Sequence, residues 1–204
     1  ASISKQFTAM MIMMCKEKGL LSYDDLVEKY LDLPYKEITI RNLLTHTSGL
    51  PDYQKIMDEN WDKSKVAGNT EILEYLNIYK PKMIFTPGEK YEYSNTGYVL
   101  LASIIEKVTG EDFVELSRKW IFEPLKMTNT SIRTNQEKKA LNNLAYGHKK
   151  DSLGRFVNAD NFLSSNYTIW LGNREGPGRV SSNAFDLLLW DQALYGETLV
   201  TKSS

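Results

Sequence analysis

The first segment of this chain constrains its fold more than any other feature. Over residues 2–18, apolar side chains recur at the i, i+3, i+4, i+7 and i+8 spacing of one helix face: Phe7, Met10, Met11, Met14 and Cys15. Ile3, Ile12 and Met13 widen this face until it covers most of the helix circumference. A helix that is apolar on most sides usually lies in the centre of its domain. We therefore predict a central helix over residues 2–18, ended by Gly19 as a left-handed residue.

Composition and charge narrow the class of protein. The 204 residues, of which 42% are apolar and 25% charged, describe a globular chain of one large domain or two small ones. With a net charge of -1, the chain lacks the broad basic field that binding to duplex nucleic acid requires. The longest apolar run, residues 9–15, is far short of the roughly 20 residues of a membrane span. The single cysteine, Cys15, excludes an intramolecular disulfide, and no His/Asp/Glu spacing indicates a metal site.

Further periodic segments predict a mainly helical chain with a few short strands. The expected helices cover residues 23–31, 40–44, 69–79, 96–108 and 111–121, with a last helix capped by Ser182 or Asn183 that runs through Leu194. Helical periodicity is lost over residues 128–177, where residues 145–147 and 154–157 are expected to form a hairpin. No linker divides the chain, so we treat residues 1–204 as one segment.

A Ser-x-x-Lys element, Ser2-Ile3-Ser4-Lys5, begins the first helix. Positions i and i+3 share a helix face, so the Lys5 amine can lie over the Ser2 hydroxyl. A serine hydroxyl is a weak nucleophile until a neighbouring base takes its proton, and a lysine with a lowered pKa can do so. The alternative is an N-cap serine followed by a solvated lysine, because the string alone is common.

A second candidate element is Tyr93-Ser94-Asn95, which lies in a loop after Pro87-Gly88 and just before a helix. Such loops carry functional residues more often than helix interiors do. The Tyr93 phenol can relay a proton there, and the Asn95 amide can orient Lys5 or a substrate carbonyl. The alternative is a Ser or Asn helix cap behind a packed tyrosine. A similar string, Tyr75-Leu76-Asn77, lies inside a helical pattern and is explained by packing or solvent.

Taken together, the motifs resemble the serine β-lactamase and penicillin-binding-protein family, in its class C β-lactamase, D-alanyl-D-alanine carboxypeptidase and esterase branch. The resemblance covers nearly the whole chain and is carried in order by residues 2–8 (SISKQFT), 38–50 (ITIRNLLTHTSGL), 87–88 (PG), 93–98 (YSNTGY), 121–130 (IFEPLKMTNT), 181–182 (SS), 186–187 (DL) and 190–194 (WDQAL). Each motif is weak by itself, and their order makes the set specific.

This resemblance implies a role for each of four residues. Ser2 is the expected acylated nucleophile, with its backbone N–H as one oxyanion donor. Lys5 shares or accepts the Ser2 proton, Tyr93 is the general base or proton relay, and Asn95 holds Lys5 and the substrate amide. The implied activity is serine acyl transfer and hydrolysis of a D-Ala-D-Ala peptide, a β-lactam or a small ester, without a cofactor. The resemblance also implies a periplasmic, membrane-anchored or secreted parent protein.

Three departures from the family pattern qualify these expectations. The third motif, Lys or His followed by Thr or Ser and Gly, is missing, because the near match Val108-Thr109-Gly110 ends a helix. The sheet strands that flank the helical region in the family are also missing. The glycine-rich turn before the last helix reads Gly176-Pro177-Gly178-Arg179-Val180, which leaves its shape open. We therefore expect the helical portion of an α+β fold without most of its central antiparallel sheet, and reduced activity.

The sequence leaves two alternatives to this catalytic interpretation open. His46 can be considered as the base of a Ser–His pair, although its tight loop, residues 46–51, favours a structural role. The whole chain can also be a binding or regulatory domain that keeps the scaffold without turnover. The presence of Ser2, Lys5, Tyr93 and Asn95 together counts against that alternative, whereas a full-length chain without the third motif would favour it.

Overall fold

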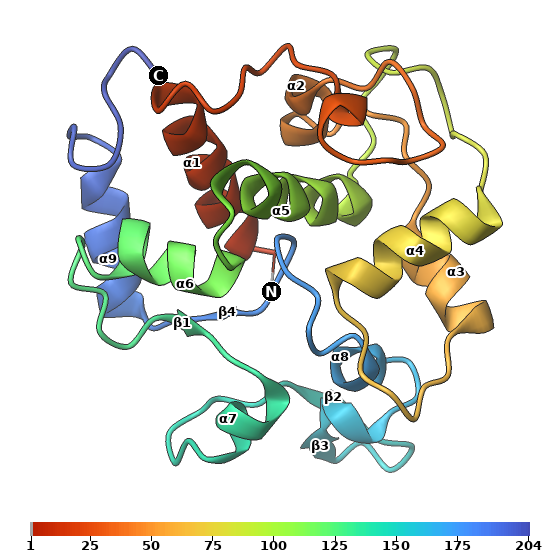
Figure 1. The fold of residues 1–204 in the computed structure, drawn as a ribbon. Coiled ribbons are helices and arrows are strands. Elements are labelled where there is room, and N and C mark those ends of the chain that lie inside the picture. Colours follow the sequence, from red (N-terminus) through yellow and green to blue (C-terminus); the bar gives the residue numbers. More distant parts are fainter. Residues whose placement is uncertain (1) are drawn as a thin grey trace.

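Helices form most of the regular structure in the computed structural model, which describes residues 2–204 apart from the side chain of Asn161 (Figure 1). The helical elements are α1 (Ser4–Glu17), η1 (Val27–Lys29), α2 (Ile40–Leu44), α3 (Tyr53–Asn60), α4 (Asn69–Tyr79), α5 (Asn95–Thr109), α6 (Phe113–Ser117), η2 (Arg118–Phe122), α7 (Asn135–Lys139), η3 (Ala159–Asn161), α8 (Tyr167–Trp170) and α9 (Ala184–Ala193). The strands are β1 (Ser131–Ile132), β2 (His148–Lys150), β3 (Phe156–Asn158) and β4 (Val180–Ser181).

The strands pair only locally within the described residues 2–204. β1 pairs antiparallel with β4, with Ile132 opposite Val180. β2 pairs antiparallel with β3, with Lys149 opposite Val157. The mainly helical class with a few short strands is therefore confirmed.

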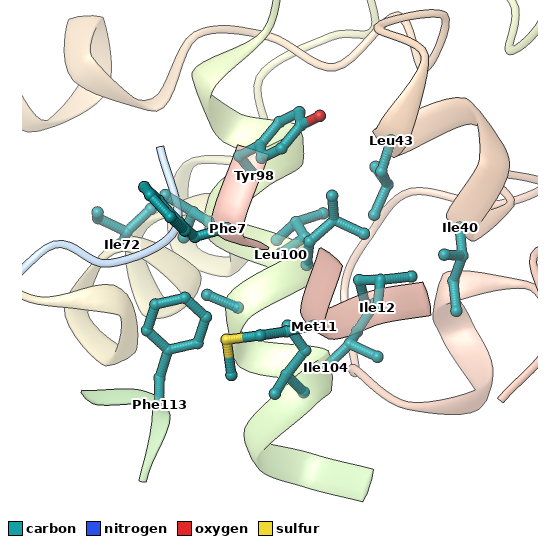
Figure 2. Packing of buried hydrophobic residues seen from close by; sticks show 14 of the residues in the cluster. Phe7, Met11, Ile12, Ile40, Leu43, Ile72, Tyr98, Leu100, Ile104 and Phe113 are labelled. Carbon is teal, nitrogen blue, oxygen red and sulfur yellow. The ribbon is translucent and has the colours of Figure 1, made fainter. Parts of the chain in front are cut away.

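Helix α1 lies in the middle of the molecule and packs along α5, as its apolar pattern predicts (Figure 1). Figure 2 shows Met11 and Ile12 of α1 beside Ile104 of α5, and all three side chains are fully buried. Gly19 takes a φ of 71° after the helix, which is the left-handed conformation expected for its end. Burial of this continuous apolar interface stabilises the fold.

Helix α5 fixes the position of the residues just before it. The Ser94 hydroxyl accepts a hydrogen bond from the Gly97 N–H at 3.1 Å and so caps the helix. Gly110 ends α5 with a φ of 70°. Because residues 96–105 are buried, the start of α5 is held firmly against α1 and α2. Asn95, two residues after Tyr93, therefore lies at a defined point at the start of α5.

The loop between α8 and β4 crosses the starts of both central helices. Gly176 has a φ of 94°, and a Cβ atom at this position would lie 2.0 Å from the Tyr98 carbonyl oxygen of α5. The Thr8 hydroxyl of α1 donates to the Gly176 carbonyl at 2.9 Å. Residues of two different helices thus hold Gly176 in place. The backbone of the glycine-rich turn lies so close to the Tyr98 carbonyl that only glycine fits there.

Several local predictions were wrong in detail. The helix expected over residues 23–31 is reduced to η1, because Val27 N–H donates to the Ile38 carbonyl instead of continuing a helix. Helix α3 was not predicted, and Asp52 caps it through the Gln54 N–H. The predicted helix over residues 111–121 is divided into α6 and one π-helical turn, η2.

The hairpin expected in the region without helical periodicity exists, with its first strand at β2 instead of residues 145–147. Its second strand, β3, overlaps the expected residues 154–157. Asp151 explains the turn, because its side chain accepts from the N–H groups of Leu153 and Arg155. Figure 1 shows this hairpin and α7 at the end of the molecule opposite α2.

The Gly176 contact yields a stability prediction. We expect Gly176→Ala to lower the free energy of unfolding by about 3 kcal/mol or more, because the new Cβ meets the Tyr98 carbonyl and the φ is positive. Gly154 also has a positive φ, but a Cβ there has nothing within 4 Å. Gly154→Ala is therefore the matched control and should cost about 1 kcal/mol. Urea unfolding of both variants measures the difference, and equal losses would contradict the account.

Candidate active site

The Ser-x-x-Lys element lies at the first turn of α1. Ser2 precedes the helix in an exposed turn, and the Lys5 N–H donates to the Ser2 carbonyl at 3.1 Å. This turn places Lys5 Nζ 3.4 Å from Ser2 Oγ, as the shared helix face predicts. Lys5 is only 6% exposed, so its amine is not the solvated lysine of the alternative interpretation.

The Tyr-x-Asn element meets the same two residues from the start of α5. The Tyr93 hydroxyl donates to Ser2 Oγ at 2.8 Å, and Lys5 Nζ donates to Asn95 Oδ1 at 2.8 Å. The four residues that the sequence singled out therefore form one hydrogen-bonded cluster, although 91 positions separate Tyr93 from Ser2. Their catalytic roles remain predictions, because geometry alone does not test turnover.

The carbonyl oxygen of Pro177 is a fifth member that the sequence analysis missed. Lys5 Nζ donates to this oxygen at 3.1 Å. The loop that carries Pro177 is the glycine-rich turn whose shape the sequence left open. Its departure from the family pattern drew attention to the loop, but a backbone acceptor has no side-chain signature in a sequence.

The electrostatics of the cluster bring the pKa values of two groups towards neutrality. Burial lowers the pKa of Lys5, as does the charge of Arg174, while Tyr93 opposes the shift. Burial raises the pKa of Tyr93, but the Lys5 ammonium and the Ser2 hydroxyl outweigh burial, and the net shift is downward. An amine and a phenol that each release a proton more easily than usual can exchange one with a serine hydroxyl between them.

The N-terminus of α1 adds a fixed positive field at the same place. Helix α1 is 14 residues long, and Ser2 lies just ahead of its first turn. Unpaired backbone N–H groups at a helix start favour negative charge nearby. A negative charge that develops beside Ser2 is therefore stabilised by the helix as well as by Lys5.

His46 is a structural neighbour of this cluster, and the alternative of a Ser–His pair is not supported. Its Nδ1 accepts a hydrogen bond from the Ser94 N–H at 3.1 Å. The ring lies against Tyr93 and Tyr98, with centroid distances of 4.7 and 5.1 Å. Burial, followed by the Lys5 charge, lowers the pKa of His46. A neutral imidazole therefore supports the Tyr93 loop from behind.

A cavity of ≈ 350 Å³ opens beside Ser2. Asn95 lines it, together with three cationic side chains that the sequence analysis did not connect with the site: Lys138, Arg174 and Arg179. Lys138 comes from α7, and the two arginines come from the loop between α8 and β4. Because the sequence has no periodicity in this region, nothing in it indicated that these cations meet.

Within residues 2–204 no group of three or more His, Cys, Asp and Glu side chains could hold a metal ion. In the same part of the chain no helix is both long and apolar enough to cross a membrane. Cys15 is buried, and burial raises the pKa of its thiol to about 12. Such a thiol is protonated and unreactive at neutral pH.

The role of His46 can be tested through stability. The unfolded chain binds a proton at this side chain near pH 6.5, whereas the folded protein binds it only at lower pH. The free energy of unfolding should therefore fall as the pH drops below about 6.5. His46→Asn keeps an acceptor and tolerates the positive φ of 58°, so it should lose this pH dependence.

The disruptive counterpart is His46→Leu, which removes the acceptor for the Ser94 N–H. This variant should be less stable than His46→Asn by about 1–3 kcal/mol in chemical unfolding. Equal stability of the two variants at neutral pH would show that the hydrogen bond does not support the loop.

Comparison with known proteins agrees with this geometry. A sequence model of the Beta-lactamase family matches residues 1–204. The chain is 41% identical to penicillin-binding protein 4* of Bacillus subtilis (strain 168) over 207 residues, which cover all of this chain and 46% of that protein. The chain thus spans about half the length of this relative.

Solved structures show the same likeness in three dimensions. The octameric penicillin-binding protein homologue from Pyrococcus abyssi superposes with a TM-score of 0.82 at 32% identity, over all of this chain and 46% of that one. D-amino acid amidase from Ochrobactrum anthropi SV3 superposes with a TM-score of 0.80 at 26% identity, over all of this chain and 56% of that one. On the family match and these similarities, the chain belongs to the Beta-lactamase family.

Proposed function

We propose that this protein is a serine acyl-transfer hydrolase that works through a Ser2 acyl-enzyme. One observation carries the proposal: Ser2 Oγ accepts from both the Tyr93 hydroxyl at 2.8 Å and Lys5 Nζ at 3.4 Å. A nucleophile needs a base within hydrogen-bond reach, and here two candidate bases share it. The Asn95 and Pro177 oxygens hold the amine in place, so the geometry does not depend on an exposed lysine.

Acylation begins when the cluster loses one proton. A deprotonated Tyr93 or Lys5 takes the hydroxyl proton of Ser2 as Oγ bonds to the substrate carbonyl carbon. The carbonyl π electrons move to oxygen, and the positive field at the start of α1 stabilises that oxyanion. The lowered pKa values of Tyr93 and Lys5 allow the deprotonated form to exist closer to neutral pH.

Collapse of the tetrahedral intermediate completes the first half of the reaction. The carbonyl re-forms, the bond to the leaving group breaks, and the proton taken from Ser2 passes through Tyr93 to the leaving nitrogen or oxygen. Water then attacks the Ser2 ester and gives its proton to the same base, which releases the carboxylic acid and restores the hydroxyl. Each proton transfer in this cycle passes through the Ser2, Lys5 and Tyr93 cluster, which ends with the protons it began with.

The proposed substrates are amides, β-lactams or esters built on a D-amino acid. Relatives that carry the names penicillin-binding protein and D-amino acid amidase support this range without choosing within it. The extracytoplasmic location implied by the family resemblance is part of the same proposal. The reduced activity expected for a chain without the third motif also stays a prediction.

Intact-protein mass spectrometry tests the proposal. After incubation with a penicillin or, separately, a fluorophosphonate, we expect one covalent adduct per chain, which Ser2→Ala should abolish because it removes the attacking oxygen. Ser152→Ala, at an exposed loop position, is the matched control and should retain the adduct. Circular dichroism establishes that each variant is folded.

A folded protein that forms no adduct with either reagent would contradict the acyl-transfer proposal. That result would favour the binding or regulatory alternative. An adduct that persists in Ser2→Ala would place the nucleophile elsewhere and would equally overturn the assignment of Ser2.

A further inference from the structure

We propose that the cavity beside Ser2 receives an anionic arm of the substrate, a carboxylate or a phosphate, which pairs with Lys138, Arg174 and Arg179. That the ligand is a substrate rests on the proposed function. That the ligand carries a negative charge rests on the cations that line the cavity. These three cations line the ≈ 350 Å³ cavity together with Ser2 and Asn95. Because all five residues line one cavity, a single ligand can reach both the Ser2 hydroxyl and the cations.

The cavity wall has an excess of positive charge. Within the part of the chain that the structure describes, no Asp or Glu side chain lines this cavity. The remaining polar lining is neutral and includes Gln54, Asn135 and Thr168. Like charges in a partly enclosed space repel one another, and a bound anion relieves the repulsion.

Arg174 has a neutral hydrogen-bond partner and keeps its charge. Its Nη1 donates to the Tyr53 hydroxyl at 2.7 Å. Burial raises the pKa of Tyr53 to about 12, so this phenol stays uncharged and leaves the guanidinium charge in place. Arg174 Nε is buried with no hydrogen-bond partner, and Arg174 has no ion pair with any residue in the described range 2–204. A planar guanidinium with an unused donor fits a carboxylate or phosphate oxygen.

Arg179 is paired, but the pairing is incomplete. Its Nη1 lies 3.1 Å from Glu175 Oε1, and its side chain is only 8% exposed. Burial raises the pKa of Glu175, and the charge of Arg179 opposes that shift. Arg179 Nε, like that of Arg174, is buried without a hydrogen-bond partner. The two arginines each keep an unused donor, and both line the same cavity.

Lys138 completes the cationic group from α7. Burial lowers its pKa, and so do the charges of Arg179, Arg174 and, more weakly, Arg133. Asp160 opposes this shift, while its carboxylate also accepts from the Thr168 hydroxyl. The net downward direction shows that burial and the positive neighbours outweigh the attraction of Asp160.

Binding to a protein that cannot turn over the ligand tests the proposal directly. In the Ser2→Ala background, N-glutaryl-D-alanine methyl ester is compared with its neutral glutaramoyl analogue and with a 3-phosphonopropionyl analogue by isothermal titration calorimetry. We expect the two anionic ligands to bind about tenfold tighter or more than the neutral one at low salt. The ranking of carboxylate against phosphonate identifies the preferred anion.

Substitutions locate the anion in the cavity. Arg174→Gln and Lys138→Gln, each added to Ser2→Ala, should reduce the charged-to-neutral preference to about threefold or less. Lys139→Gln is the matched control, because Lys139 is exposed on the same helix and does not line the cavity. It should leave the preference unchanged. Circular dichroism verifies that every variant is folded.

Three results would overturn the inference: equal affinity for charged and neutral ligands, no detectable binding of either anionic ligand at millimolar concentration, or a preference that survives both cavity substitutions. Failure of the proposed function gives a different result. In that case Ser2 forms no adduct in mass spectrometry, while the Ser2→Ala protein still prefers the anionic ligands and loses this preference with Arg174→Gln.

Discussion

Burial of the Lys5 amine is the constraint on which the rest of the site depends. A buried ammonium is costly unless oxygen atoms surround it, and here the Asn95 side chain and the Pro177 backbone supply them. The ring of Tyr93 lies on another side, with its centroid 4.8 Å from Nζ. Three segments that are far apart in the sequence must therefore meet at one nitrogen. The same burial lowers the pKa of the amine, so one physical cause both organises the site and prepares its chemistry.

The packing of the central helices α1 and α5 holds the segments that meet at the Lys5 amine in place. Because α1 is apolar on most sides and packs along α5, the starts of the two helices are brought together, and Ser2 and Asn95 lie at those starts. The Gly176 loop then crosses both helices and carries Pro177 to Lys5, and its continuation brings Arg179 to the cavity. The Ser2 nucleophile and the proposed anion site thus line one cavity, and the loop that carries Pro177 and Arg179 forms part of its wall. Their relative position is set by backbone contacts more than by surface side chains.

The sequence predicted the parts of this arrangement that have local signatures. The apolar stripe of α1, the left-handed Gly19 after it and the end of α5 at Gly110 each follow from spacing or residue type, and all three are present in the structure. The meeting of Lys5 with Tyr93 and Asn95 was expected from family resemblance, since spacing alone relates only Ser2 to Lys5. The Pro177 acceptor and the three cavity cations were not predicted, because they depend on how non-periodic loops fold over the helices. Helix α3 was missed for a similar reason: its eight residues follow a proline loop and have a mixed polar pattern.

On our proposal, Lys5 and Tyr93 act as one proton-accepting unit on Ser2. A double-mutant cycle tests this through the rate at which a fluorophosphonate phosphonylates Ser2, with Lys5→Ala, Tyr93→Phe and the double variant compared with the unchanged protein. The account predicts strong non-additivity, in which the double variant is about as slow as the slower single variant, because either change disables the unit. Losses that multiply independently would contradict the account and would assign the two residues separate roles.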